Sequence, residues 1–122
     1  MERLGSISVV IPAYNEESRL PATLRSVVSF LRAGPWASWE VLIVNDGSRD
    51  ATAAVAGEAA AANPCVRLLN NPGNRGKGYS VRRGMLEARG DWVLFSDADL
   101  SARRVEAHLD YGRRALLDPR SA

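Results

Sequence analysis

Short runs of hydrophobic, mostly β-branched residues alternate along the chain with longer stretches in which hydrophobic residues recur at every third or fourth position. The short runs predict strands, because an unbroken apolar run of this length is typical of a strand buried on both faces. The predicted strands are residues 6–11, 39–44, 66–69 and 92–96. The longer stretches predict helices after each of the first three strands. These helices cover residues 20–31 and 52–62 and a third segment that carries Val81, Met85 and Ala88 and ends at Gly90.

Strands that alternate with single helices need crossover connections, which produce a parallel sheet with helices on both faces. The predicted fold class is therefore α/β, with a doubly wound, Rossmann-like sheet of strand order 3-2-1-4. A chain of 122 residues has room for one such domain, residues 1–122. In the tail after Ala102, the spacing of Val105, Leu109 and Leu116 is close to helical and predicts a further, polar helix.

The composition narrows the class of protein. A hydrophobic fraction of 46% and a charged fraction of 25% are typical of a globular domain. The net charge of +2, without a long basic block, does not indicate nucleic-acid binding. No apolar run approaches the roughly 20 residues of a membrane-spanning helix, and the N-terminus lacks the pattern of a signal peptide. A single cysteine, Cys65, expected to be a small buried thiol, fits a reducing compartment, so a cytoplasmic location is predicted.

The order 3-2-1-4 also predicts where a ligand binds. In a doubly wound sheet the binding crevice lies beyond the carboxyl ends of strands 1 and 4, where the winding direction reverses. Two polar loops occupy those strand ends, residues 12–16 and 97–99, and the loop 45–50 after strand 2 is expected beside them.

Asp97 and Asp99 stand two residues apart directly after the fourth predicted strand. In an extended backbone their carboxylates project to the same side. Two adjacent negative charges are unfavourable unless a cation neutralises them, and oxygen ligands favour Mg²⁺ or Mn²⁺ over zinc. We therefore expect these residues to bind a divalent metal, although a pair of this kind is by itself also compatible with a solvated turn.

A second polar segment, residues 73–78 (GNRGKG), opens the third predicted helix. Backbone N–H groups at a helix start, together with Lys77, suit an anion such as a nucleotide phosphate. The glycine spacing fits neither a Walker A loop nor a dinucleotide fingerprint. A flexible turn without a ligand remains the alternative.

Tyr14 and Glu16 stand where a nucleotide base would stack on an aromatic ring or be contacted by a carboxylate. Asp46 and Ser48 are candidates for contacts to the base or the ribose. Ser48, or Asp50, is equally a candidate N-cap for the second helix. The only histidine, His108, is expected on the surface of the tail helix, since no triad partner is evident.

Four motifs in this order resemble glycosyltransferase family 2. They are residues 9–16 (VVIPAYNE), 45–48 (NDGS), 74–78 (NRGKG) and 97–100 (DADL). The resemblance covers about residues 6–101 and is strongest to the dolichyl-phosphate β-glucosyltransferase branch, with the dolichyl-phosphate mannose synthases as near relatives. It implies a GT-A fold in which Pro12, Tyr14 and Glu16 line the nucleotide site. It further implies that Asp46 contacts the nucleoside.

The resemblance assigns the metal to Asp97 and Asp99, which would serve catalysis by holding the ion. Two departures stand out. Asn45 occupies a position where the family usually has an aspartate, and the family's proline shortly after the Asp-x-Asp motif is missing, since residues 102–104 read ARR. Acceptor-binding residues of the family lie beyond this point, so the chain is expected to be truncated after the motif.

The function predicted from the resemblance is transfer of a sugar to a polyprenyl phosphate or another lipid acceptor at the cytoplasmic face of a membrane. UDP-glucose is the favoured donor, GDP-mannose the second. A truncated, non-catalytic nucleotide-binding module is the alternative. A nucleotidyltransferase on a similar sheet would need a glycine-rich loop after strand 1, where this chain has Tyr14, Asn15 and Glu16. No oligomeric state is predicted.

Overall fold

The computed structural model describes residues 4–96, 106–110 and 113–117. The elements alternate between strands and helices up to β4 and end with two further strands. In chain order they are β1 (Leu4–Ala13), α1 (Leu20–Ala33), β2 (Trp36–Asn45), α2 (Thr52–Ala62), β3 (Val66–Asn70), α3 (Lys77–Glu87), β4 (Trp92–Phe95), β5 (Glu106–Asp110) and β6 (Arg113–Leu117). The predicted α/β class is confirmed, and the predicted bounds of α2 match those observed.

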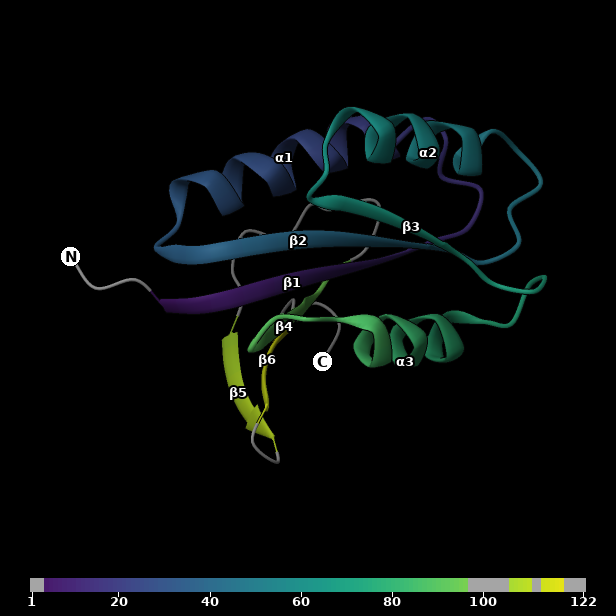
Figure 1. The fold of residues 1–122 in the computed structure, drawn as a ribbon. Helices are drawn as coiled ribbons and strands as arrows, with labels where there is room; N and C mark the ends of the chain where they lie inside the picture. Colours follow the sequence, from purple (N-terminus) through teal and green to yellow (C-terminus); the bar gives the residue numbers. More distant parts are fainter. Residues whose placement is uncertain (1–3, 97–105, 111–112, 118–122) are drawn as a thin grey trace.

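The six strands form one sheet of order β3-β2-β1-β4-β6-β5, which confirms the predicted order 3-2-1-4 for the first four. All neighbours are parallel except β5, which pairs antiparallel with β6. At the centre of the sheet, Val9 of β1 pairs with Val41 of β2 and with Leu94 of β4. Helices α1 and α2 cover one face and α3 covers the other, as predicted (Figure 1).

The prediction of a helical tail is wrong. Leu109 and His108 lie in β5 and Leu116 lies in β6, while Val105 falls outside the described residues. The reason is a distant pairing, because Leu116 stands opposite Leu94 of β4 and β5 then adds to the outer side of β6. Hydrophobic spacing over so short a segment does not distinguish a helix from a strand that gains its partner elsewhere in the chain.

The core has an apolar layer on each face of the sheet. Under α1 and α2 it includes Ile7, Val9, Ile11, Leu24 and Leu31, among other buried residues. Under α3 the layer is thinner and includes the buried residues Val10, Leu42, Val44, Ala88 and Val93. No helix in the described part of the chain is both long and apolar enough to cross a bilayer.

Helix α3 packs directly on the central strand because it carries a glycine at the contact. A Cβ placed on Gly84 would lie 2.2 Å from Cγ1 of Val10, far inside van der Waals contact. Val10 itself is fully buried in β1. The glycine therefore allows the helix backbone to approach the sheet and fixes which side of α3 faces inward.

Candidate functional site

Three loops converge at the carboxyl ends of the first three strands. They are residues 14–19 after β1, 46–51 after β2 and 71–76 after β3. They start level with one another, because Ala13 pairs with Asn45 and Asn45 pairs with Asn70. The end of β4 joins this edge, since the N–H of Ser96 donates to the carbonyl of Val10 at 3.0 Å. The predicted neighbourhood of loops 12–16 and 45–50 is confirmed, whereas Asp97 and Asp99 lie outside the described residues.

The first two loops are joined by side chains that bond to backbone N–H groups. The N–H of Asn15 donates to Oγ of Ser48 at 2.9 Å, and the N–H of Arg49 donates to Oδ1 of Asn15 at 2.8 Å. The N–H of Glu16 donates to Oγ1 of Thr52 at 2.8 Å. Asn15 adopts a left-handed conformation (φ 53°), which asparagine tolerates better than most residues. The two loops therefore form one connected surface.

The start of α2 decides between the two candidate caps. Oδ1 of Asp50 accepts the N–H of Thr52, the first residue of the helix, at 2.9 Å, and the hydroxyl of Thr52 also donates to it. That hydroxyl is the main reason why the pKa of Asp50 is lowered. Ser48 instead bridges to the first loop, so Asp50 is the residue that satisfies the helix start.

Asp46 joins the second loop to the third. Its carboxylate is buried, with 5% of the residue exposed. Oδ1 accepts the N–H of Arg75 at 2.7 Å and the amide of Asn71 at 2.9 Å, and Oδ2 accepts the N–H of Gly76 at 2.9 Å. Burial alone would raise the pKa of Asp46, but these three donors together hold it below its ordinary value of 3.8. The carboxylate is therefore ionised at neutral pH.

These bonds change the interpretation of the glycine-rich loop. The N–H groups of Arg75 and Gly76 were expected to be free for an anion, but both donate to the carboxylate of Asp46. The negative charge that they meet thus comes from the protein itself. Gly47 makes this contact possible, because a Cβ there would lie 2.5 Å from the backbone N of Asn74. The predicted contact of Asp46 with a nucleoside stays a prediction, as does the contact of Lys77 with phosphate.

Asn45 makes a hydrogen bond that the family's usual aspartate could not make. Its Nδ2 donates to Oδ1 of Asn70 at 2.9 Å, and its Oδ1 accepts the N–H of Ser48 at 3.2 Å. An ionised carboxylate has no donor for the first of these bonds. The departure at this position therefore ties β2 to β3 just where both strands end.

Two contributors to this edge were not among the predicted site residues. Asn71, with 7% of the residue exposed, donates to both Asp46 and Oγ of Ser80, at 2.9 and 2.8 Å. Its own Oδ1 accepts from Arg83 at 3.2 Å. An asparagine in a loop rich in Gly, Asn and Pro is too common to be singled out. Thr52 was predicted as the first residue of a helix, but its bond to Glu16 depends on the other loop.

The surface of the site is formed by the remaining predicted residues. Tyr14 is 42% exposed, and Pro12 is half-buried at the end of β1. Glu16 is half-buried, and its Oε2 has no hydrogen-bond donor among the described residues. The nearest cation, Arg19, lies 3.7 Å from that oxygen and is itself largely exposed. Lys77, exposed, begins α3 at the edge of this surface.

A metal centre is not formed by the described residues alone. Within 4–96, 106–110 and 113–117, no group of three His, Cys, Asp or Glu side chains is placed to hold a metal ion. The predicted ligands, Asp97 and Asp99, follow directly after Ser96, the last described residue at the end of β4.

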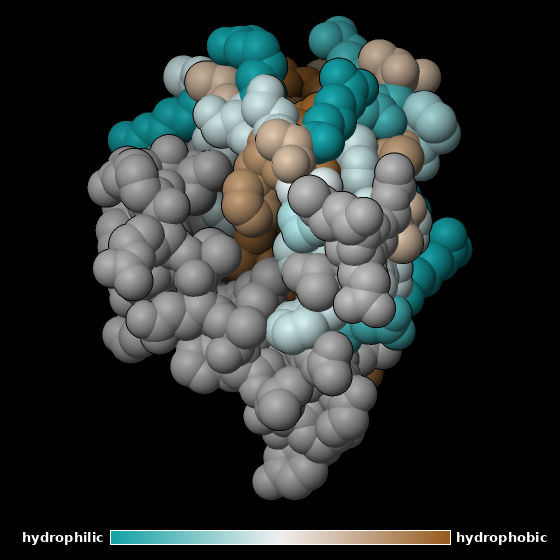
Figure 2. Space-filling view, turned by 90° about the vertical axis from the view of Figure 1, so that its left-hand side faces the viewer, coloured by the Kyte–Doolittle hydropathy of each residue, from teal (hydrophilic) through white to brown (hydrophobic). Residues whose placement is uncertain are grey.

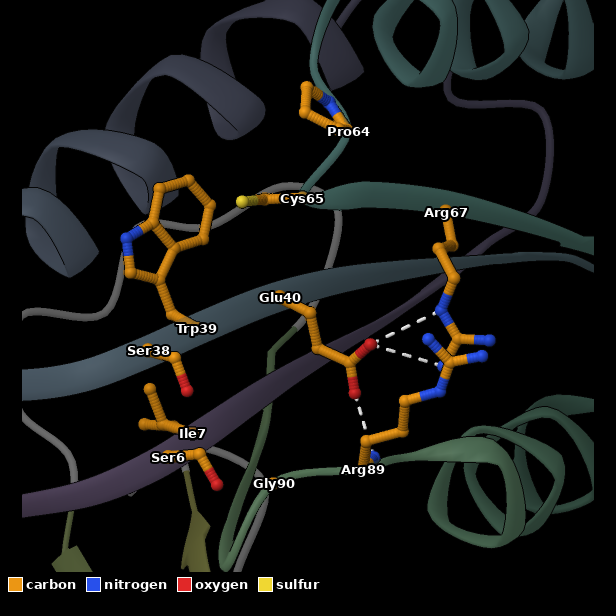
Figure 3. A pocket seen from close by; sticks show the side chains of 10 residues that line it. All are labelled: Ser6, Ile7, Ser38, Trp39, Glu40, Pro64, Cys65, Arg67, Arg89 and Gly90. Carbon is orange, nitrogen blue, oxygen red and sulfur yellow. Dashed lines mark hydrogen bonds and ion pairs between the residues drawn. The ribbon is translucent and has the colours of Figure 1, made fainter.

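The opposite, amino-terminal edge of the sheet carries a hollow of about 310 Å³, far from these loops in the fold. Figure 2 shows this edge, where hydrophobic residues are visible between hydrophilic ones. Trp39 and Cys65 lie on one side of the hollow and Glu40 with Arg67 on the other (Figure 3). Cys65, expected to be buried, is half-buried because it precedes β3 at the edge of the sheet.

The polar groups of this hollow bind one another. The carboxylate of Glu40 accepts a hydrogen bond from the hydroxyl of Ser8 at 2.6 Å. It also accepts the N–H of Arg89 at 2.7 Å and lies 3.1 Å from the guanidinium of Arg67 (Figure 3). Burial raises the pKa of Glu40, but these donors and the charge of Arg67 lower it below 4.5. Arg67 also donates to the carbonyl of Glu87 at the end of α3. The cluster is thus a structural connection between four segments.

Known proteins share both the sequence and the fold. Residues 8–107 match the family described as "Glycosyl transferase family 2". A dolichyl-phosphate beta-glucosyltransferase of Drosophila melanogaster is 50% identical over an alignment of 99 residues, and the match covers 76% of this chain and 30% of that protein. The chain spans about 30% of the length of the relatives that it matches.

Two solved structures have the same Rossmann-like GT-A arrangement of sheet and helices. The mannosyltransferase of Pyrobaculum calidifontis, in complex with GDP-Man and Mn²⁺, has a TM-score of 0.70 and 25% identity over 80% of this chain and 28% of its own. TarS 1-349 of S. aureus, in complex with UDP-GlcNAc, has a TM-score of 0.68 and 28% identity over 77% and 26%. With its four ordered motifs, its strand order and the match over residues 8–107, this chain belongs to glycosyltransferase family 2.

Proposed function

We propose that this chain is the nucleotide-sugar-binding part of a glycosyltransferase that transfers a sugar from a nucleoside diphosphate to a lipid-linked phosphate. UDP-glucose is the favoured donor and GDP-mannose the second, and the acceptor is a polyprenyl phosphate at the cytoplasmic face of a membrane. Support comes from the relatives named as dolichyl-phosphate beta-glucosyltransferases and from the structural neighbours solved with GDP-Man or UDP-GlcNAc.

The observation that carries this proposal is the carboxylate of Glu16. A buried carboxylate oxygen without a donor is costly, and a ligand hydroxyl or N–H group removes that cost by donating to it. The ribose and the base of a nucleotide offer both kinds of donor. The exposed ring of Tyr14 on the same loop provides a surface on which a base can stack. We assign nucleoside binding to these two residues, with Pro12 and Ser48 shaping the loops around them.

A divalent metal is the second part of the proposal, with Asp97 and Asp99 as its ligands. Their oxygen-only donor set suits Mg²⁺ or Mn²⁺. The placement of Ser96, bonded to the carbonyl of Val10 beside the first loop, supports this assignment, since Asp97 is its neighbour in the chain. When bound, such an ion would offset negative charge on the diphosphate.

The main task of the protein is then to position the acceptor phosphate and the donor sugar for reaction. A phosphate oxygen of the acceptor attacks the anomeric carbon of the sugar, the bond from that carbon to the diphosphate oxygen breaks, and the nucleoside diphosphate leaves with the electron pair. The acceptor oxygen is already anionic, so it needs less help from a general base than a sugar hydroxyl does. Lys77, at the start of α3, is the cation that we assign to the diphosphate.

Calorimetric titration with UDP and Mn²⁺ tests this function. Glu16→Ala should weaken binding about tenfold, the loss expected for a hydrogen bond to a charged group. The matched control is Glu17→Ala, which removes the same charge from an exposed neighbour and should leave affinity within about twofold. Equal affinities for the two variants would show that Glu16 does not bind the nucleotide.

Two further measurements separate the metal and the catalytic parts. Asp99→Ala should abolish the Mn²⁺ dependence of UDP binding while the circular dichroism spectrum stays unchanged. Transfer of labelled glucose to polyprenyl phosphate distinguishes an active transferase from a chain that only binds nucleotide. Binding of GDP in preference to UDP would redirect the donor assignment to GDP-mannose.

A further inference from the structure

The outward side of α3 carries large apolar side chains where a helix on a sheet normally carries polar ones. Tyr79, Arg82 and Leu86 follow one another at spacings of three and four, so they lie along one line of the helix. Tyr79 is 44% exposed, Leu86 is 76% exposed and Arg82 is exposed. Ser80 and Gly84 of the same helix are buried against the sheet. We call the line formed by Tyr79, Arg82 and Leu86 the α3 stripe.

The segment of the chain that carries the α3 stripe is rich in positive charge. Between Arg75 and Arg89 the chain has five cationic residues and one acidic residue, whereas the whole chain has a net charge of only +2. Arg75 and Arg89, at the two ends of this segment, are both exposed. An exposed apolar line among cations is the pattern of a surface that rests on anionic lipid headgroups.

The position of the α3 stripe relative to the nucleotide site is fixed by a contact at the start of the helix and by another along its inner side. At its start, Gly76 is bonded to the carboxylate of Asp46, so α3 begins at the third loop of the site. Along its inner side, Gly84 packs against Val10, where even a Cβ would overlap, so this side of the helix faces the sheet. A membrane under the α3 stripe would therefore lie next to the site, not on the far side of the sheet.

We propose that the α3 stripe docks this chain on an anionic membrane surface and thereby brings the site to the level of the lipid phosphates. The inference rests on the proposed function, because a lipid-linked acceptor is reached only at a membrane. Tyr79 and Leu86 enter the headgroup layer, and Arg82, which lies between them on the helix, faces lipid phosphates. Contact with a membrane would account for the exposure of the two large side chains, Tyr79 and Leu86. The positive charge of the α3 stripe favours anionic lipid.

Co-flotation with vesicles of phosphatidylcholine, alone or mixed with phosphatidylserine, tests the α3 stripe on the 122-residue chain. Arg82→Glu combined with Leu86→Ser should lower binding to the anionic vesicles about tenfold. The matched control is Arg25→Glu combined with Phe30→Ser, which reverses one charge and removes one large apolar side chain at exposed positions of α1, on the opposite face of the sheet (Figure 1). The control should bind like the unmodified chain, and added salt should weaken its binding.

Several results would overturn the proposal. The first is equal vesicle binding by the two double variants, and the second is binding that does not depend on phosphatidylserine. The third is a dimer in sedimentation that dissociates only in the α3 variant, which would make the α3 stripe a contact between copies of the chain. Tyr79→Ser, tested alone, gives a second measurement if the double variant does not fold. Calorimetry with UDP and Mn²⁺ should give the same affinity for all variants. Loss of UDP binding in every protein, the unmodified chain included, would count against the nucleotide site and not against the α3 stripe.

Discussion

Replacing Asp46 by asparagine tests whether its buried charge holds the second and third loops together. The substitution keeps the shape of the side chain but turns one acceptor oxygen into an NH₂ donor. That donor must face the N–H of Arg75 or of Gly76, which now bond to the carboxylate at 2.7 and 2.9 Å. One charge-assisted bond is lost and two donors are left facing each other where only 5% of the residue is exposed. We expect Asp46→Asn to lower the free energy of unfolding by about 2–3 kcal/mol.

Urea unfolding followed by tryptophan fluorescence at several pH values measures this effect. The folded-state pKa of Asp46 lies below its ordinary value of 3.8, so its stabilising contribution is fully present above pH 3.8 and is lost as the pH falls through the lowered value. The gap between the original chain and Asp46→Asn should therefore be constant near neutral pH and shrink in acid. Glu58→Gln, at an exposed position of α2, is the control for loss of a charge. A gap below about 0.5 kcal/mol at pH 7, or one that grows in acid, would refute the reasoning.

Three further substitutions test other contacts by the same unfolding measurement. Gly84→Ala should lower the free energy of unfolding by about 1–3 kcal/mol, because the added methyl group overlaps with Val10. Val10→Ala should destabilise the Gly84→Ala chain less than it destabilises the original chain. If the two losses simply add, the residues are not in direct contact. Glu40→Gln should cost about 1–3 kcal/mol at pH 7 and progressively less as the pH falls through the lowered pKa of Glu40, and a pH-independent loss would contradict its ionised role. Asn45→Asp should lower the free energy of unfolding by about 1–2 kcal/mol at neutral pH, because the donor to Oδ1 of Asn70 is lost and the Asn70 amide must turn before it can bond to the carboxylate. Unchanged stability would show that this amide bond is dispensable.

Local patterns were enough to predict the four-stranded part of the fold. The apolar runs at 6–11 and 39–44 lie inside β1 and β2, which extend further at both ends because pairing continues into polar residues such as Ser38. The strand order was expected from the doubly wound class, and it is the order observed. The tail was mispredicted because β6 depends on its pairing with β4, which no local spacing records.

The candidate site was predictable in its location and only partly in its contacts. The winding of the sheet indicated which loops meet, and the loops after β1 and β2 do meet, whereas loop 97–99 lies outside the described residues. The individual bonds were not predictable, since Ser48 and Asp46 bond mainly to backbone N–H groups of neighbouring loops. Asn71 was missed because its importance comes from its burial between Asp46 and Ser80. Asn45, noted in the sequence only as a departure from the family's usual aspartate, supplies a donor to Asn70.

The bonds among the three loops have a consequence for the thermodynamics of binding. Amide hydrogens of Asn15, Arg49 and Gly76 belong to loops, yet each is held by a side chain of a different loop. Their exchange with solvent deuterium should therefore be slow and should accelerate together when any one link is cut. A nucleotide then meets a surface that is already ordered, so less conformational entropy is lost on association.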